Sequence, residues 1–302
     1  MTEFHAGILF GLISAVTFVV LGLWSREIQH REGPWRFLFY VNAVPALMAV
    51  VWWLIHPPDF SWPLLRAVLM AGVPAVTGLF FMGLAVRYAD VSHVGPVMGS
   101  KALVATLLAV AFGFEPVGPE LWAASGMLLV ALFLASGNRQ VLRRPWVVVD
   151  RGLVLGLLMC TFASLADLIT RRQMHDHNLA IWDFVSMSWF VRGSVASVVL
   201  VAVCKARGLR VLPRRASTLW VTGPIVVAHG VAIVTAFRLL DSAVLANVLS
   251  SLRGVFSVLA VLLLGRWNIG RTEHLTRGMI AARVIGSLLI VAAVYLALSG
   301  RL

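Results

Sequence analysis

Three basic residues, Lys101, Arg192 and Arg253, each lie near the middle of a long apolar segment. A charged side chain at the centre of a membrane helix costs about 2.5–3.5 kcal/mol on insertion scales, so it usually faces a water-filled cavity or a partner. An arginine can hold a carboxylate or phosphate through two parallel hydrogen bonds, and a lysine offers a point charge. We therefore expect these side chains to bind an anionic group of a small-molecule substrate, with a structural ion pair as the alternative.

Two titratable groups could act together with these cations. Asp167 is the only acidic residue deep within an apolar segment, and one carboxylate cannot neutralise three cations. Its side chain could take up and release a proton, or it could serve as the counter-ion of Arg253 or Arg192. His229, near the middle of another apolar segment, could carry a proton at physiological pH or hydrogen-bond across helices. Both residues are candidates for proton coupling.

Two further charged pairs stand at the ends of apolar segments. Arg87 and Asp90, like Arg238 and Asp241, are three residues apart. This spacing predicts local ion pairs and helix caps that fix tight turns. The sequence shows no phosphate-binding loop, metal-ligand cluster or nucleophile motif. We therefore expect no catalytic residue, no metal and no cofactor, and the chain is not expected to be an enzyme.

The composition predicts an all-α integral membrane protein. The 302 residues are 60% hydrophobic and only 13% charged, too few charges to cover a soluble protein. Apolar stretches near twenty residues recur, and a backbone in lipid must satisfy its own hydrogen bonds, which predicts helices. The net charge of +12 does not indicate nucleic acid, because the arginines form short tracts between apolar segments. Ten transmembrane helices are predicted, at 4–24, 37–55, 64–86, 92–113, 119–137, 152–170, 181–203, 217–237, 243–265 and 279–298.

The two halves of the chain resemble each other. The glycine pair in Gly7–Leu12 returns in Gly152–Leu157, and Lys101 matches Arg253 at an offset that drifts by only a few residues over four helices. We predict a five-helix repeat at 1–138, a basic linker at 139–151 and a second five-helix repeat at 152–302. Because five is odd, the second repeat must be inverted, as in many secondary transporters with a site at the repeat interface.

The loops predict an orientation in the membrane. The loops on the side of the two termini hold five basic residues, and those on the other side hold 17 of the 25. Basic loops stay in the cytoplasm, so both termini are expected outside a bacterial inner (plasma) membrane.

In its ten-span count, its 5+5 duplication and the stretch from Gly83 to Ser136, the sequence resembles the drug/metabolite transporter superfamily, in the ten-helix, duplicated, EamA-like form. The family's usual Leu-Gly-Glu ending has one residue inserted before Glu115, and Gly99-Ser100 replaces the family's mid-helix proline. The resemblance implies a multi-pass inner-membrane transporter.

The charges then suggest the cargo. The first predicted helix contains no acid between Phe4 and Trp24, which argues against the small multidrug exporters of the superfamily that exchange protons for cationic drugs. We expect a secondary transporter that moves a small anionic or zwitterionic metabolite by alternating access. The alternatives are a broad-specificity amino-acid or metabolite exporter and a flippase for a lipid-linked phosphate. The expected partners are the substrate and the lipid bilayer, with a homodimer as a further expectation and no nucleic acid.

Overall fold

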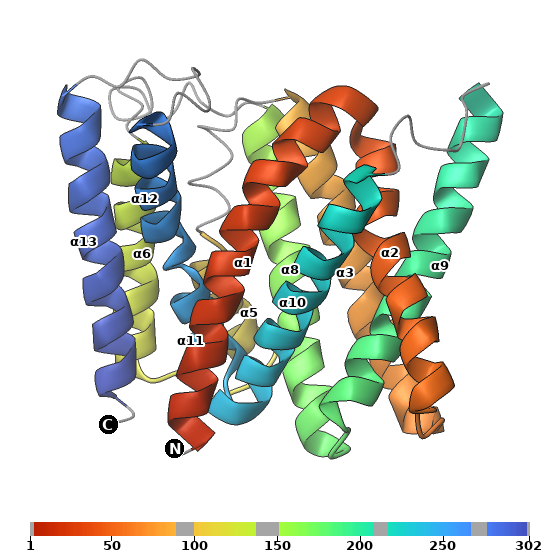
Figure 1. Cartoon of the computed structure of the whole chain (residues 1–302). Helices are drawn as coiled ribbons and strands as arrows, with labels where there is room; N and C mark the ends of the chain where they lie inside the picture. Colours follow the sequence, from red (N-terminus) through yellow and green to blue (C-terminus); the bar gives the residue numbers. More distant parts are fainter. Residues whose placement is uncertain (1–2, 89–99, 137–150, 208–216, 267–276, 301–302) are drawn as a thin grey trace.

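The computed structural model describes residues 3–88, 100–136, 151–207, 217–266 and 277–300. These residues form eleven α-helices and no strand, so the all-helical fold class is confirmed for the described part of the chain. The helices are α1 (Glu3–Glu32), α2 (Pro34–Ile55), α3 (Trp62–Tyr88), α5 (Lys101–Ala111), α6 (Pro119–Ser136), α8 (Arg151–Asp176), α9 (Ile181–Arg207), α10 (Ser217–Leu240), α11 (Ala243–Ser250), α12 (Arg253–Arg266) and α13 (Arg277–Ser299). They pack side by side, and the two ends of the chain lie on the same side of the bundle (Figure 1).

Seven of these helices are long and apolar enough to cross a membrane, namely α1, α2, α3, α8, α9, α10 and α13. Each coincides with a predicted span. The other three predicted spans coincide with shorter apolar helices, at Lys101–Ala111, Pro119–Ala131 and Ala243–Leu259. The chain is therefore a multi-pass membrane protein, while the count of ten spans stays a prediction.

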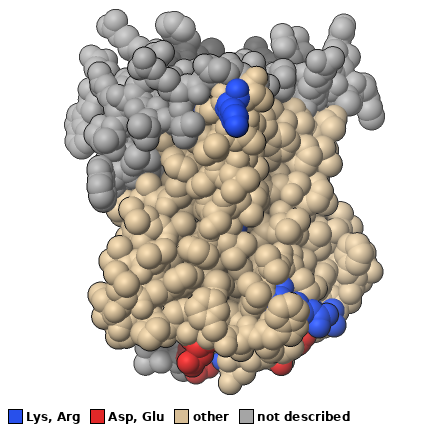
Figure 2. Space-filling model, turned by 90° about the vertical axis from the view of Figure 1, so that its right-hand side faces the viewer, with Lys and Arg blue, Asp and Glu red and all other residues tan. Residues whose placement is uncertain are grey.

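The outer surface has the pattern that a bilayer requires. On the face formed by α2 and α9, charged side chains gather near the two ends, and the broad band between them is almost entirely uncharged (Figure 2). Large apolar side chains are exposed along the helices, including Leu54, Val73, Val198 and Leu288. In water such a surface would promote aggregation, whereas in lipid it is the favoured contact.

The helices of the two halves pack against one another in pairs. The most extensive contacts join α3 to α8, α1 to α10, α6 to α13 and α2 to α9. If the halves are duplicates, α1, α2, α3 and α6 correspond to α8, α9, α10 and α13. The α3–α8 contact is then equivalent to the α10–α1 contact, and the other two contacts each join a helix to its own counterpart. This is the pattern that related halves would produce. The duplication itself stays a prediction.

Small residues allow several of these close contacts. A Cβ atom added to Gly78 on α3 would lie 3.2 Å from the backbone nitrogen of Ala163 on α8. One added to Gly11 on α1 would lie 3.2 Å from the side chain of Leu249. Backbones that approach this closely are typical of helix contacts in membranes.

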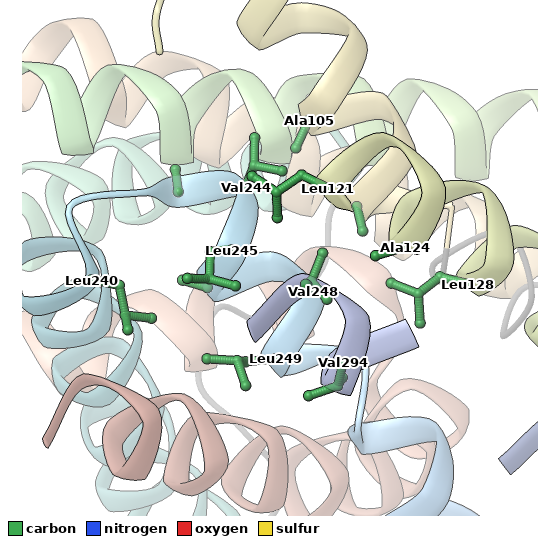
Figure 3. Packing of buried hydrophobic residues seen from close by; sticks show 14 of the residues in the cluster. Ala105, Leu121, Ala124, Leu128, Leu240, Val244, Leu245, Val248, Leu249 and Val294 are labelled. Atoms are coloured by element: carbon green, nitrogen blue, oxygen red, sulfur yellow. The ribbon is translucent and has the colours of Figure 1, made fainter. Parts of the chain in front are cut away.

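The largest buried apolar cluster surrounds α11. All eight residues of this short helix are buried. Leu245, Val248 and Leu249 on α11 lie between Leu240 on α10, Leu121 and Leu128 on α6, and Val294 on α13 (Figure 3). The apolar cluster fixes the position of α11 and thereby the polar residues that α11 carries.

The predicted helix at 243–265 is broken in the structure. A turn at Ser251 and Leu252 separates α11 from α12. Backbone hydrogen bonds to the third preceding residue are formed there, from Leu252 N to Leu249 O and from Gly254 N to Ser251 O, in place of the usual bonds to the fourth. The Ser251 hydroxyl also donates to the carbonyl of Asn247 at 3.0 Å. Serine back-bonding of this kind bends helices, and glycine is a poor helix former, so the local sequence accounts for the break.

Two predicted boundaries also differ. α1 continues through a polar segment to Glu32, beyond the predicted end at residue 24, because apolar content marks the membrane segment and not the end of the helix. Of the predicted helix at 92–113, the structure describes the part from Ser100 onward, and α5 begins at Lys101.

Candidate functional site

Lys101 and Asp167 form an ion pair between α5 and α8. The Lys101 Nζ and Asp167 Oδ2 atoms are 2.6 Å apart. Asn247 on α11 donates from Nδ2 to the same carboxylate oxygen at 3.0 Å, and to the carbonyl of Ala243 at 2.9 Å. The Ser164 hydroxyl on α8 donates to the carbonyl of Lys101 at 3.1 Å. The pair is thus held by three helices.

The pair is only partly buried. The side chains of Lys101 and Asp167 keep 18% and 17% of their surface accessible. Arg192, His229 and Arg253 are likewise half-buried.

Arg253 begins α12 and lies against α1. Its guanidinium carbon is 4.5 Å from the centroid of the Phe18 ring, a cation–π contact. The other neighbour of Phe18 is His229 on α10, with ring centroids 5.3 Å apart. His229 Nδ1 lies 3.1 Å from the carbonyl oxygen of Ser14 and 3.2 Å from its hydroxyl. Both contacts involve the same ring nitrogen, so Ser14 fixes the orientation of the imidazole.

Electrostatic interactions join these groups into one cluster. The carboxylate of Asp167 is close enough to interact with the charges of both Arg192 and Arg253. All three cations act on His229. We call Lys101, Asp167, Arg192, His229 and Arg253 the charge cluster; with a neutral histidine, these five side chains carry three positive charges and one negative charge.

The structure therefore brings together all five residues that the sequence suggested for binding and coupling, while their roles stay predictions. For Asp167 the sequence left open a role in proton coupling or as the counter-ion of Arg253 or Arg192, and in the structure its carboxylate is in direct contact with Lys101. Arg192 donates from Nε to the carbonyl of Ser188 at 3.3 Å, within its own helix α9.

The expected local pair of Arg238 and Asp241 is corrected by the structure, which gives the two residues different partners. Asp241 lies just beyond α10 in the left-handed conformation, with φ of 48°, so it no longer shares a helix face with Arg238. Its Oδ1 accepts from Arg171 Nη2 at 2.8 Å. Arg238 instead donates to the carbonyl of Met174 in the last turn of α8 at 3.1 Å and to that of Leu179, just after α8, at 3.2 Å. For the other expected pair, the side chain of Arg87 and the whole of Asp90 lie outside the described residues.

One buried carboxylate was not among the predicted site residues. Glu115 follows α5, and its side chain is only 2% exposed. It accepts from the Ser242 hydroxyl, Ala243 N and Val244 N, each at 2.9 Å, and so caps the first turn of α11 from a distant part of the chain. The local signals were its place in the modified Leu-Gly-Glu ending and an acid two residues after the glycine that follows an apolar segment.

Arg171 connects this cap to the end of α10. Its Nε is 3.8 Å from Glu115 Oε2, and its Nη1 donates to the carbonyl of Phe114 at 3.4 Å. With its bond to Asp241, it links the α5–α6 turn, α8 and the α10–α11 turn. We call Glu115, Arg171, Arg238 and Asp241 the terminal-side network, because it lies on the side where the chain begins and ends (Figure 1). A cavity of about 340 Å³ opens beside it, lined by Arg171, His175, Asn178, Phe237, Arg238 and Asp241.

Comparisons with known proteins show what the chain that carries this site is similar to. Residues 5–137 match the EamA-like transporter family. An uncharacterized transporter of Archaeoglobus fulgidus is 25% identical over 119 residues, which is 39% of this chain and 42% of that protein. The matched part thus spans less than half the length of that relative.

The structural similarity extends over nearly the whole chain. A protein of known crystal structure superposes with a TM-score of 0.65 and 15% sequence identity, covering 97% of this chain and 96% of that one. At this identity the similarity shows the fold alone. The sequence similarity to EamA-like transporters thus lies in residues 5–137, and over the rest of the chain the similarity is one of fold.

Proposed function

We propose that this chain is a secondary transporter that moves a small anionic or zwitterionic metabolite across the membrane by alternating access. The observation that supports the proposal most is the charge cluster, in which three cations and one carboxylate from α5, α8, α9 and α12 gather within the bundle. Intramembrane charges are expensive, so they are expected to face a cavity and to serve a substrate. The excess of positive charge favours an anion.

The arrangement also suggests how binding could drive movement. Lys101 and Arg253 occupy the first positions of α5 and α12, one in each predicted repeat. A substrate that contacts both would link the proposed halves, 1–138 and 152–302. We propose that the halves are inverted repeats and rock about this site, as in other transporters built in this way.

The terminal-side network supports a specific conformational state. Arg171 and Arg238 tie the ends of α8 and α10 to neighbouring turns through ion pairs and carbonyl contacts. We propose that these contacts close the terminal side and must break before the site opens there. The loop charges, with 17 basic residues on the opposite side, support a bacterial plasma-membrane protein with both termini outside.

The carboxylate of Asp167 would also suit a zwitterionic substrate. A carboxylate beside an arginine and a lysine could receive the ammonium group of an amino acid while Arg253 holds its carboxylate. A broad-specificity amino-acid exporter would use the same side chains. The choice between these substrate classes depends on whether an added ammonium group strengthens binding.

A thermal-shift screen of the purified full chain tests the proposal. The panel contains organic acids, amino acids, sugar phosphates and cationic drugs, because a ligand that binds only the folded state raises the melting temperature. We expect stabilisation by anions or zwitterions that is lost in Lys101→Ala and Arg253→Ala. Arg66→Ala, which removes an exposed arginine at the start of α3, is the matched control. Stabilisation by cationic drugs alone would contradict the anion preference.

A further inference from the structure

The carboxylate of Asp167 occupies the position that a substrate anion would need on Lys101. Its Oδ2 lies 2.6 Å from the lysine ammonium and also accepts from Asn247 Nδ2. Both donors are the kind that a ligand carboxylate would use. In the structure, Asp167 therefore acts as an internal anion in this part of the charge cluster.

We propose that binding of an anion at Lys101 is coupled to uptake of one proton by Asp167, so that the transporter moves its anion together with a proton. This inference rests on the proposed function. A second carboxylate brought to Lys101 would stand beside that of Asp167, and two adjacent carboxylates are strongly disfavoured when both are ionised. Protonation of Asp167 removes the repulsion and releases Lys101 for the ligand.

The surroundings of Asp167 explain why the proton would arrive with the ligand and not before it. Lys101 on α5 contacts the carboxylate of Asp167 directly, and Arg192 on α9 and Arg253 on α12 are close enough to interact with its charge. Cys160 lies on the same helix as Asp167 and interacts electrostatically with Lys101 and Arg253. A bound anion shares the attraction of these cations with Asp167 and so weakens their hold on its charge.

His229 is the other candidate for the proton, and the geometry favours Asp167. The histidine faces all three cations, so an imidazolium there would add a fourth positive charge to the cluster. Its Nδ1 is already in contact with the Ser14 carbonyl, at 3.1 Å. Asp167, in contrast, is in direct contact with the group that the ligand would take over.

Asn247 would keep the site in place during this exchange. Its amide is anchored to the Ala243 carbonyl at 2.9 Å, independently of Lys101. When the ammonium turns to the ligand, the amide still donates to the carboxyl oxygen of Asp167. The proton enters from the side on which the anion binds and leaves with it on the other side, so one proton crosses per anion.

Isothermal titration calorimetry of the full chain in buffers with different ionisation enthalpies measures the protons taken up per ligand. The probes are lactate, malate, glutamate and inorganic sulfate, which stay ionised between pH 6.5 and 8.5. For wild type we expect uptake of nearly one proton and an affinity that falls about tenfold per pH unit as the pH rises. Asp167→Asn mimics the protonated state, so its affinity should be independent of pH and tighter than that of wild type at pH 8.5. Arg66→Gln, which changes an exposed arginine outside the charge cluster, should keep the wild-type proton uptake.

The possible outcomes separate the two proposals. Binding without proton uptake in wild type would overturn the coupling and leave anion transport intact. Uptake that persists in Asp167→Asn would place the proton elsewhere and also overturn it. Failure of every probe to bind wild type would overturn the proposed function and the coupling together. The wild-type measurement decides the question even if a variant fails to fold.

Discussion

The ammonium of Lys101 and the carboxylate of Asp167 lie 2.6 Å apart, and they join α5 of the first predicted repeat to α8 of the second. Removing one partner of a partly buried pair leaves the other charge without compensation. We expect Asp167→Asn and Lys101→Gln each to lower the melting temperature, and the double variant Lys101→Gln with Asp167→Asn to recover part of the loss. A double-mutant cycle should give a coupling energy of about 1–3 kcal/mol. Additive effects would contradict a stabilising pair.

The cap that Glu115 places on α11 should be important for stability. Glu115→Ala removes the acceptor of two backbone N–H groups and of the Ser242 hydroxyl, in a buried position. We expect a loss of about 1–3 kcal/mol, because buried donors without a partner are expensive. Asp176→Asn, which changes an acid with 46% exposure at the end of α8, should alter stability by about 0.5 kcal/mol or less. Equal effects of the two changes would argue against the cap.

The terminal-side network should hold the α10–α11 turn closed. Arg171→Ala removes the bond to Asp241 and the contacts with Phe114 and Glu115. We expect faster amide hydrogen exchange at the start of α11, since local opening there would require less free energy. The neighbouring Arg172, with 47% exposure and an ion pair to Asp176, provides the control variant Arg172→Ala. Unchanged exchange in Arg171→Ala would show that the network does not fasten this turn.

The contact between α2 and α9 depends on Gly193. A Cβ atom there would lie 2.7 Å from the carbonyl oxygen of Asn42, closer than such atoms approach in folded proteins. Gly193→Ala should therefore lower the melting temperature although alanine is the better helix former. At Gly126 on α6 an added Cβ meets nothing within 4 Å, so Gly126→Ala should be neutral or slightly stabilising. A stabilised Gly193→Ala would contradict the close contact.

The fold and the charge cluster differ in how far the sequence could predict them. Long apolar segments imply helices for a general physical reason, and seven of the predicted segments are helices long and apolar enough to cross a membrane. Lys101, Arg192 and Arg253 could be selected because charges are rare in such segments. The pairing of Asp167 with Lys101 and the cap by Glu115 could not be predicted from the sequence. Each contact joins segments far apart in the chain, and local spacing carries no signal of such contacts.

Helix ends show the same limit on a smaller scale. The three-residue spacing of Arg238 and Asp241 fits a helix face, but α10 ends at Leu240 and Asp241 adopts a left-handed conformation. The break at Ser251 lies within an apolar segment, where hydropathy alone predicts one continuous helix. In hindsight, the two serines followed by Arg253 and Gly254 were the signal for it.

Solute counterflow in proteoliposomes tests anion transport through the charge cluster most directly. Vesicles containing the full chain are loaded with an excess of the anion that stabilises the protein best, and the uptake of trace labelled anion is followed. We predict a transient accumulation of label that is abolished in Lys101→Ala and Arg253→Ala and retained in Arg66→Ala. Accumulation that persists without both cations, or counterflow of cationic solutes alone, would contradict the account.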